Sequence, residues 1–172
     1  MTDTSRPLNV LFLCTHNSAR SILAEALLNH LGAVNGVRRF QAYSAGSSPR
    51  DNQQPNPLGL QVLQAAGIET AGLRSKSWDE FAGPDVPPMD LIITVCDNAA
   101  GETCPYWPGH PATAHWGYPD PSAGDAPDAQ KLVAFRQTLH ALHQRLELLV
   151  SLPPEKLQRT LLQDTARALI HH

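Results

Sequence analysis

Two short apolar runs constrain the fold of this chain more than any other feature of its sequence. Residues 10–13 are apolar throughout, and residues 91–95 are apolar except for one threonine. Neither run alternates apolar with polar side chains, as a strand with one face in water does. Such strands are typical of a parallel sheet that is covered on both faces. We therefore expect an α/β fold.

The rest of the chain supplies the strands and helices that such a sheet needs. Two further strands are predicted over residues 40–45 and 112–116. Apolar side chains at three- and four-residue spacing predict helices that begin near residues 21 and 57, and a long helix over residues 132–149. Strands that alternate with helices predict a four-stranded parallel sheet flanked by helices, in three layers.

A pair of prolines, Pro153 and Pro154, ends the long helix, and a further apolar helical pattern follows it. A chain of 172 residues suits a single domain with a substantial buried core. We expect that domain over residues 1–152 and a helical extension over residues 153–172. The extension is expected either to pack on the sheet layer or to mediate dimers, so a monomer and a homodimer are both open.

Charge and hydropathy exclude several classes of protein. Thirteen Lys and Arg against sixteen Asp and Glu give a net charge of −3, which argues against a general binder of nucleic acids or anionic membranes. No segment reaches the roughly 18 apolar residues of a membrane span, and the N-terminus does not resemble a signal peptide. The expected location is the cytoplasm, where three cysteines are more readily catalytic or redox-active than structural disulfides.

The segment between the first strand and the first helix carries the clearest chemical signal, because Cys14 and Arg20 lie six positions apart in it. A loop of this length can curl so that its backbone N–H groups face a tetrahedral oxyanion beside the positive end of the following helix. The same field stabilises a thiolate, and a guanidinium can bind two anion oxygens. Asn17 tolerates the left-handed backbone that a tight loop needs, and the hydroxyls of Ser18 and Ser21 can donate to the sulfur. The expected oxyanion-binding residues are Thr15, His16, Asn17, Ser18, Ala19, Arg20 and Ser21.

Residues 13–21 resemble the phosphate loop of low-molecular-weight tyrosine phosphatases and of the arsenate reductases related to them. The similarity extends from about residue 10 to about residue 149 and includes Tyr-Ser-Ala-Gly at 43–46 and His-Trp-Gly-Tyr-Pro-Asp-Pro at 115–121. The resemblance implies a four-stranded parallel sheet with flanking helices and a nucleophile at Cys14. It also implies that Asp120 is the general acid that protonates the leaving oxygen.

Two activities fit this resemblance, reduction of arsenate and hydrolysis of phosphate monoesters, and both begin with attack of a thiolate on a tetrahedral oxyanion. Tyrosine phosphatases of this fold usually place an aromatic residue after the Asp-Pro pair, but Ser122 stands there. We therefore expect an arsenate reductase that serves arsenic detoxification, with a phosphotyrosine or small-ester phosphatase as the alternative. A sensor of anions or redox state is a third hypothesis, and Asp120 argues against it because a sensor needs no leaving-group acid.

Reduction of arsenate needs two electrons, which further thiols can supply. Cys96 follows the strand at 91–95, and Cys104 is eight residues further on. In an α-helix these residues would stand ~12 Å apart, beyond the roughly 7 Å that a disulfide allows between Cα atoms, but the segment between them contains Gly, Asn and Asp and can unwind. The resemblance implies that Cys96, or glutathione in its place, attacks Cys14, and that the disulfide of Cys96 then passes to Cys104. Thioredoxin or glutathione with glutaredoxin would then restore the enzyme, and no metal or organic cofactor is expected.

Some members of this family hold a monovalent cation beside the anion loop. The resemblance places three of its ligands at Asn17, Glu25 and Ser44, and the fourth, an aspartate in those members, at Lys76. An ammonium at that position could replace the ion and make it unnecessary.

Overall fold

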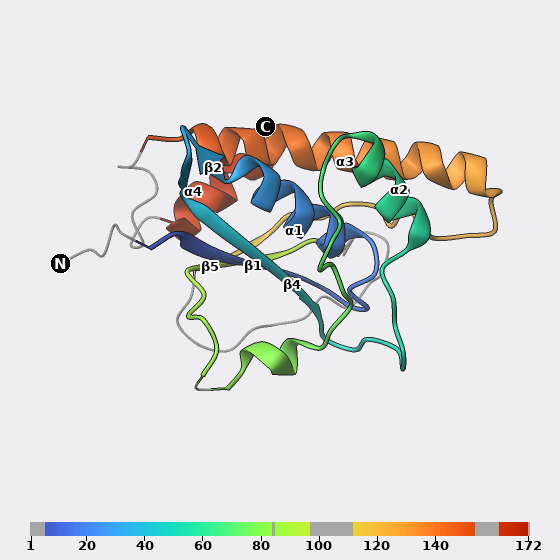
Figure 1. Ribbon diagram of the computed structural model, residues 1–172, viewed down its shortest axis with the longest axis horizontal. Coiled ribbons are helices and arrows are strands. Elements are labelled where there is room, and N and C mark those ends of the chain that lie inside the picture. The colour runs from blue at the N-terminus through green and yellow to red at the C-terminus, as the bar shows by residue number, and fades with distance from the viewer. Residues whose placement is uncertain (1–5, 84, 97–111, 154–161, 172) are drawn as a thin grey trace.

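The computed structural model describes residues 6–83, 85–96, 112–153 and 162–171 of the chain. In this part, the main sheet consists of β1 (Leu8–Cys14), β4 (Phe40–Gly46), β5 (Leu91–Thr94) and β6 (Ala112–His115). The strands are all parallel and lie in the order β4-β1-β5-β6 (Figure 1). The predicted four-stranded parallel sheet is confirmed, and its strand bounds differ from the prediction by at most two residues.

The strand β1 is central, because β4 pairs with one of its edges and β5 with the other. Cys14, the last residue of β1, pairs with Gly46 at the end of β4, and Leu13 pairs with Thr94 at the end of β5. The chain builds β4 on one side of β1 and later builds β5 on the other side. In sheets of this kind, ligands bind in the crevice at the carboxyl ends of the strands, where the order of the strands reverses.

Helices cover one face of the sheet, and they are α1 (Arg20–Leu31), α2 (Pro57–Ala65), α3 (Asp128–Ser151) and α4 (Leu162–Ala168). Figure 1 shows α1 between the strands and the long α3. The short 3-10 helix η1 (Trp78–Phe81) lies on the other side of the strands in the same view. The sheet is therefore flanked on both sides, as the predicted three-layer fold requires. No helix in the described part of the chain is long and apolar enough to cross a bilayer.

Side chains along β1 enter two separate cores. Val10 and Phe12 belong to the large core beneath α1 and α3, whereas Leu11 and Leu13 belong to a smaller core on the opposite face of the sheet. All four side chains are at most 1% exposed. Full burial of one such side chain contributes about 1.5–3 kcal/mol to stability. This burial on both faces explains why the run has no polar alternation.

A small hairpin that the sequence analysis did not predict follows α1. Its strands β2 (Ala33–Val34) and β3 (Val37–Arg38) pair antiparallel around Asn35 and Gly36. Both turn residues have positive φ, 53° and 79°. This is the conformation of a type I′ turn, for which Asn-Gly is a preferred sequence. The dipeptide was therefore the available signal, because strands of two residues are too short to show a periodic pattern.

The helix α4 packs against β6 at one edge of the sheet. Trp116, which is fully buried, donates its indole N–H to the carbonyl of Ala166 at 3.0 Å. Gln163 and Arg167 bond the backbone N–H and the carbonyl of Thr113, at 3.2 and 3.1 Å. The side chains of α4 thus satisfy backbone hydrogen-bonding groups of the edge strand β6, and these groups could otherwise pair with a strand of another chain. Of the two predicted roles of the extension, packing on the sheet is observed, and dimer formation stays a prediction.

Candidate active site

The loop between β1 and α1 begins and ends on buried residues. Cys14 is 4% exposed, and Arg20, the first residue of α1, is 5% exposed. The N-cap of α1 is Ala19, and no side chain caps the first turn of this helix. The N–H groups at the start of α1, where the positive end of the helix dipole lies, therefore remain available to an anion.

The carbonyl groups of this loop point outward. The segment after β4 donates three backbone hydrogen bonds of 2.8–3.0 Å into the loop, from Ser47 to Cys14, from Ser48 to Thr15 and from Asn56 to Ser18. In a trans peptide, the carbonyl of one residue and the N–H of the next residue point in opposite directions. The described residues contain no cis peptide bond. The N–H groups of Thr15, His16 and Ala19 therefore face away from that segment, toward the inside of the loop.

Two donors surround the sulfur of Cys14, which is a free thiol. The sulfur accepts the backbone N–H of Asn17 at 3.2 Å and lies 2.9 Å from the hydroxyl oxygen of Ser21. Asn17 has the predicted left-handed backbone, with a φ of 59°. Donors of this kind stabilise a thiolate, which is the nucleophilic form of a cysteine.

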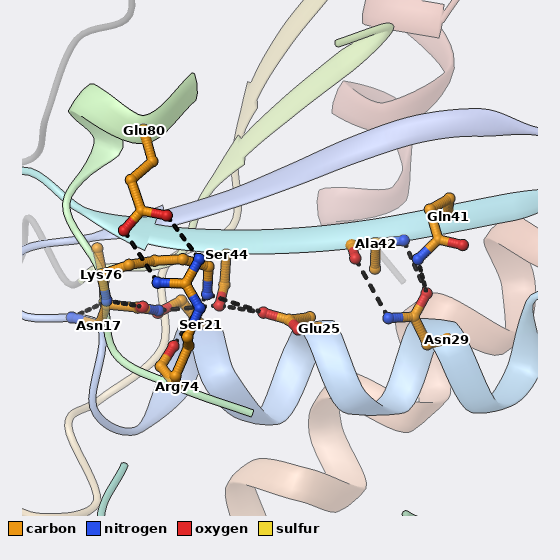
Figure 2. Close-up of polar contacts among 11 residues, drawn as sticks. Asn17, Ser21, Glu25, Asn29, Gln41, Ala42, Ser44, Arg74, Lys76 and Glu80 are labelled. Carbon is orange, nitrogen blue, oxygen red and sulfur yellow. Dashed lines mark hydrogen bonds and ion pairs between the residues drawn. The ribbon is translucent and has the colours of Figure 1, made fainter. Parts of the chain in front are cut away.

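A chain of hydrogen bonds leads from Ser21 to a carboxylate, as Figure 2 shows. The side-chain amide of Asn17 donates to Ser21 at 2.8 Å and to Ser44 at 3.0 Å, and Ser44 donates its proton to Glu25. Because the amide uses both of its N–H groups as donors, the oxygen of Ser21 is an acceptor in this contact. The proton of Ser21 is then left to point at the sulfur of Cys14, so the chain fixes Ser21 as a donor to that sulfur.

Lys76 lies at the far end of this chain. Its side chain is 7% exposed, its ammonium lies 3.6 Å from Glu25, and it donates to the carbonyl of Arg74 at 2.9 Å. The backbone N–H of Lys76 also donates to the side-chain oxygen of Asn17 at 3.0 Å (Figure 2). Burial lowers the pKa of Lys76, and the charge of Glu25 opposes that effect. The structure thus brings together the four residues that the sequence analysis assigned to a cation position, Asn17, Glu25, Ser44 and Lys76.

Gly46 allows the end of β4 to approach the anion loop closely. A Cβ at this position would lie 2.6 Å from the carbonyl oxygen of Thr15 and 3.0 Å from the backbone nitrogen of Asn17. Real Cβ atoms essentially never come so near to backbone oxygen. The Tyr-Ser-Ala-Gly motif therefore ends on a glycine for a steric reason, which sequence reasoning alone did not identify.

A pocket of about 270 Å³ opens over the sulfur, and three segments line it. The lining residues are Cys14, His16, Ser18, Ala19 and Arg20 from the anion loop, Arg50 and Gln53 from the segment after β4, and Asp120, Ser122 and Ala123. No Phe, Tyr or Trp is among these described residues. Asn17 and Ser21 are fully buried, and the backbone N–H of Asn17 and the hydroxyl of Ser21 contact the sulfur, as was expected for the hydroxyl of Ser21.

Asp120 lies where the resemblance placed it, in the same pocket as Cys14. One of its carboxyl oxygens accepts the backbone N–H of Ser122 at 2.9 Å and the hydroxyl of Ser122 at 2.7 Å. These two bonds hold the carboxyl group of Asp120 in a fixed turn. The residue that replaces the usual aromatic after Asp-Pro thus orients the predicted acid.

Arg20 is tied to the segment that carries this acid. Its guanidinium donates to the carbonyl of Tyr118 at 2.9 Å. Arg145 of α3 in turn donates to the hydroxyl of Tyr118 at 3.0 Å and stacks over the rings of Tyr118 and Trp116, 5.2 and 5.3 Å from their centres. Burial raises the pKa of Tyr118 to about 12. Sequence reasoning missed Arg145, because a single arginine on a helix surface carries no positional signal.

Cys96 follows β5 and is fully buried, and it is engaged in a disulfide. It lies at the same rim of the sheet as Cys14, because both residues stand at the carboxyl ends of adjacent parallel strands. Cys104, the third predicted thiol, lies outside the described residues. In the described part of the chain, no group of three or more His, Cys, Asp and Glu side chains could hold a metal ion.

Comparison with known proteins defines the family. The family model for low molecular weight phosphotyrosine protein phosphatases matches residues 9–163, so the chain belongs to this family. The arsenate reductase of Bacillus licheniformis is 31% identical over 140 residues, which are 80% of this chain and 91% of the relative. That of Bacillus subtilis is 30% identical over 139 residues, with the same two coverages.

Solved structures agree with this assignment. The arsenate reductase of Archaeoglobus fulgidus superposes with a TM-score of 0.64 at 28% identity, over 83% of this chain and 99% of the other. The thioredoxin-dependent arsenate reductase of Corynebacterium glutamicum gives a TM-score of 0.52 at 24% identity, over 86% of this chain and 65% of the other. The second likeness is one of fold alone.

Proposed function

We propose that the protein is an arsenate reductase, which converts arsenate to arsenite with two electrons from thiols. One observation carries the proposal: Cys14, Arg20 and Asp120 line one small polar pocket, and no Phe, Tyr or Trp is among the described residues that line it. Such a pocket suits an inorganic oxyanion better than an aryl ester. Arsenate reductases that are similar over four-fifths of the chain support the same substrate.

In the first step, the Cys14 thiolate attacks the arsenic atom. A sulfur–arsenic bond forms, and the arsenic–oxygen bond opposite the sulfur breaks. Asp120 protonates the departing oxygen, which leaves as water if it already carries a proton and as hydroxide if it does not. Arg20 and the inward N–H groups of the loop hold the remaining three oxygens, whose charge they balance.

In the second step, a thiolate attacks the sulfur of Cys14. The electron pair of the sulfur–arsenic bond moves to arsenic, so arsenite leaves and a disulfide forms. We propose that Cys96 makes this attack and that Cys104 then attacks Cys96, which releases Cys14. The redox state of the structure supports this order, because Cys14 is a free thiol while Cys96 is in a disulfide.

Thioredoxin or glutathione with glutaredoxin then reduces the last disulfide, and no metal or organic cofactor takes part in these steps. Both thiol systems maintain a reducing compartment, so we place the reaction in the cytoplasm. Glutathione could also make the attack on Cys14 in place of Cys96. A Cys96→Ser variant distinguishes these routes, because only the glutathione route survives it.

We further propose that Lys76 replaces a bound monovalent cation. Its buried ammonium faces Glu25, which accepts the last hydrogen bond of the chain that ends on the sulfur of Cys14. We expect potassium chloride to leave the wild-type rate of arsenite production unchanged relative to choline chloride. In Lys76→Met, Glu25 loses its counter-charge, and potassium should stimulate the rate, whereas Lys131→Met should behave as the wild type does. Strong stimulation of the wild type by potassium would contradict the proposal.

A phosphatase is the second candidate, because the family to which the chain belongs is that of low molecular weight phosphotyrosine protein phosphatases. The pocket argues against a phosphotyrosine substrate, since the position after Asp120-Pro121 is Ser122, whose hydroxyl is bonded to Asp120. Hydrolysis requires Cys14 and Asp120 but neither Cys96 nor Cys104. The cysteine variants therefore separate the two activities.

The decisive experiment measures arsenite production with thioredoxin and thioredoxin reductase, and separately with glutathione and glutaredoxin. Turnover of an aryl phosphate is measured in parallel. We expect arsenite from at least one thiol system and none from Cys14→Ser, and we expect Cys104→Ser to stop the thioredoxin-coupled reaction. Efficient aryl phosphate hydrolysis with no arsenite from either system would overturn the assignment as a reductase.

A further inference from the structure

The segment between β4 and α2 holds a turn against the anion loop. Two backbone hydrogen bonds to the loop follow β4, and a third, from Asn56 to Ser18, precedes α2. Between these attachments, the backbone N–H of Gln53 donates to the carbonyl of Arg50 at 3.0 Å, and Asn52 has a positive φ of 58°. The turn that carries Arg50 is thus fixed to the anion loop at both ends.

Arg50 is the second arginine that lines the pocket above the Cys14 sulfur. Unlike Arg20, which is buried and bonded to the carbonyl of Tyr118, Arg50 is exposed. Arg20 therefore belongs to the inner part of the pocket and Arg50 to the part that opens to water.

The charges of the reacting groups favour a second cation beside Arg20 and the N–H groups of the loop. Arsenate, like a phosphate group, carries about two negative charges at neutral pH, and the attacking thiolate adds a third. Arg20 supplies one permanent positive charge. Arg50 is the only other described residue lining the pocket that is always protonated, since the remaining lining side chains are neutral, acidic or an imidazole.

The direction of attack places one oxygen toward the open side of the pocket, to which the exposed Arg50 belongs. The oxygen that departs lies opposite the attacking sulfur, and the sulfur lies at the closed end of the pocket among buried groups. The departing oxygen therefore points toward the open side. In free arsenate this oxygen carries only a proton or a charge, but in a phosphate monoester it carries the organic substituent.

We infer that Arg50 is a specificity-determining residue that binds the outward oxygen of a free oxyanion and thereby favours inorganic arsenate or phosphate over phosphate monoesters. This inference rests on the proposed function, because it assigns the substrate class of the same pocket. The contact of Arg50 is lost when a substituent occupies that oxygen, whereas the contacts of Arg20 and the loop are kept.

The test measures how anions protect Cys14 from alkylation by iodoacetamide, with the modified peptide quantified by mass spectrometry. It uses the full-length protein with Cys96→Ser in every variant, the parent included, so that Cys96 cannot convert Cys14 into a disulfide when arsenate is bound. Inorganic phosphate, arsenate and phenyl phosphate are the probes, and no thiol reductant is present, so the carboxylates of glutathione cannot contribute. In Arg50→Gln, we expect the half-protecting concentration of phosphate and of arsenate to rise about fivefold, the size of effect typical of one exposed charge contact. The value for phenyl phosphate should change less than twofold.

Arg136→Gln is the matched control, because Arg136 is an exposed arginine of α3 that lines a separate groove. It should leave all three values unchanged, and Arg50→Lys should lie between the parent protein and Arg50→Gln. Unchanged protection in Arg50→Gln, or an equal loss for all three anions, overturns the inference.

Together with the assay of arsenite production, this measurement separates the inference from the proposed function. If phosphate protects Cys14 with the expected dependence on Arg50 but no arsenite forms, the oxyanion site stands and the reductase assignment fails. If arsenite forms but Arg50→Gln is protected as the parent protein is, the inference fails and the reductase assignment stands.

Discussion

At the residue scale, the hydroxyl of Ser21 is the group that links the buried polar chain to the reactive sulfur. Asn17 occupies one lone pair of Ser21, and the proton of Ser21 points at Cys14. Loss of a hydrogen bond to a charged group costs about 1.5–3 kcal/mol. We therefore expect Ser21→Ala to slow the alkylation of Cys14 by iodoacetamide at neutral pH by roughly tenfold or more.

The exposed Ser151→Ala at the end of α3 is the control for that experiment, because its hydroxyl bonds only the carbonyl of Glu147 among the contacts described. In this variant, iodoacetamide should alkylate Cys14 at the wild-type rate. An unchanged rate in Ser21→Ala would mean that the backbone N–H of Asn17 and the helix dipole suffice to stabilise the thiolate.

Tyr118 makes a second residue-scale prediction, which concerns alkaline pH. Burial raises its pKa from 10.0 to about 12 in the folded protein. Between these values the unfolded chain loses the phenol proton while the folded protein keeps it, so stability falls as pH rises through this range. We expect the free energy of unfolding of the wild type to drop by up to about 2–3 kcal/mol more than that of Tyr118→Phe between pH 10 and pH 12. Urea titrations at several pH values measure this difference, and parallel curves for the two proteins would contradict it.

At the scale of elements, the contact between the end of β4 and the anion loop leaves no room for a side chain at Gly46. Gly46→Ala would place a methyl group 2.6 Å from the carbonyl oxygen of Thr15. The strand and the loop must then separate, which costs about 1–3 kcal/mol for overpacking of this kind. We expect Gly46→Ala to lower the denaturant midpoint and to weaken the protection of Cys14 by phosphate.

Gly83→Ala is the matched control for this change, because nothing lies within 4 Å of a Cβ at Gly83. It should keep the wild-type midpoint and the wild-type protection by phosphate. Equal behaviour of the two variants would show that the anion loop can adapt to a side chain at Gly46.

At the scale of the whole molecule, α4 shares one core with the rest of the fold. Leu162 and Ala166 of α4 belong to the same buried cluster as Phe12 of β1 and Phe135 of α3. A shared core predicts a single cooperative unfolding transition in which circular dichroism and tryptophan fluorescence coincide. Leu162→Ala should lower the free energy of that transition by about 2–4 kcal/mol. A separate, earlier transition of the C-terminal segment would contradict the prediction.

Most of the fold could be predicted from the sequence because its signals are local. The runs at 10–13 and 91–95 needed only their own composition to indicate buried parallel strands, and the spacing of Cys14 and Arg20 lies within seven consecutive residues. The β2–β3 hairpin was missed because its strands are two residues long. The hydroxyl of Ser21 lies beside the sulfur, as expected. The bonds of the Asn17 side chain to Ser21, Ser44 and the backbone of Lys76 were not predicted, since a sequence does not show which partners a buried polar side chain meets.

By itself, the sequence determined the α/β class, the position of the anion loop and the identity of its cysteine and arginine, because adjacent residues and their polarity decide these features. The family resemblance alone had placed Lys76 with Glu25, and the tertiary structure shows their contact. Only the tertiary structure decided that Ser122 holds Asp120 and that Arg50 lines the pocket. Lys76 and Glu25, like Arg50 and Cys14, are far apart along the chain, and their meeting depends on how the strands order and how the loops pack. Contacts of that range follow from burial of the whole core, and no short window of sequence encodes them.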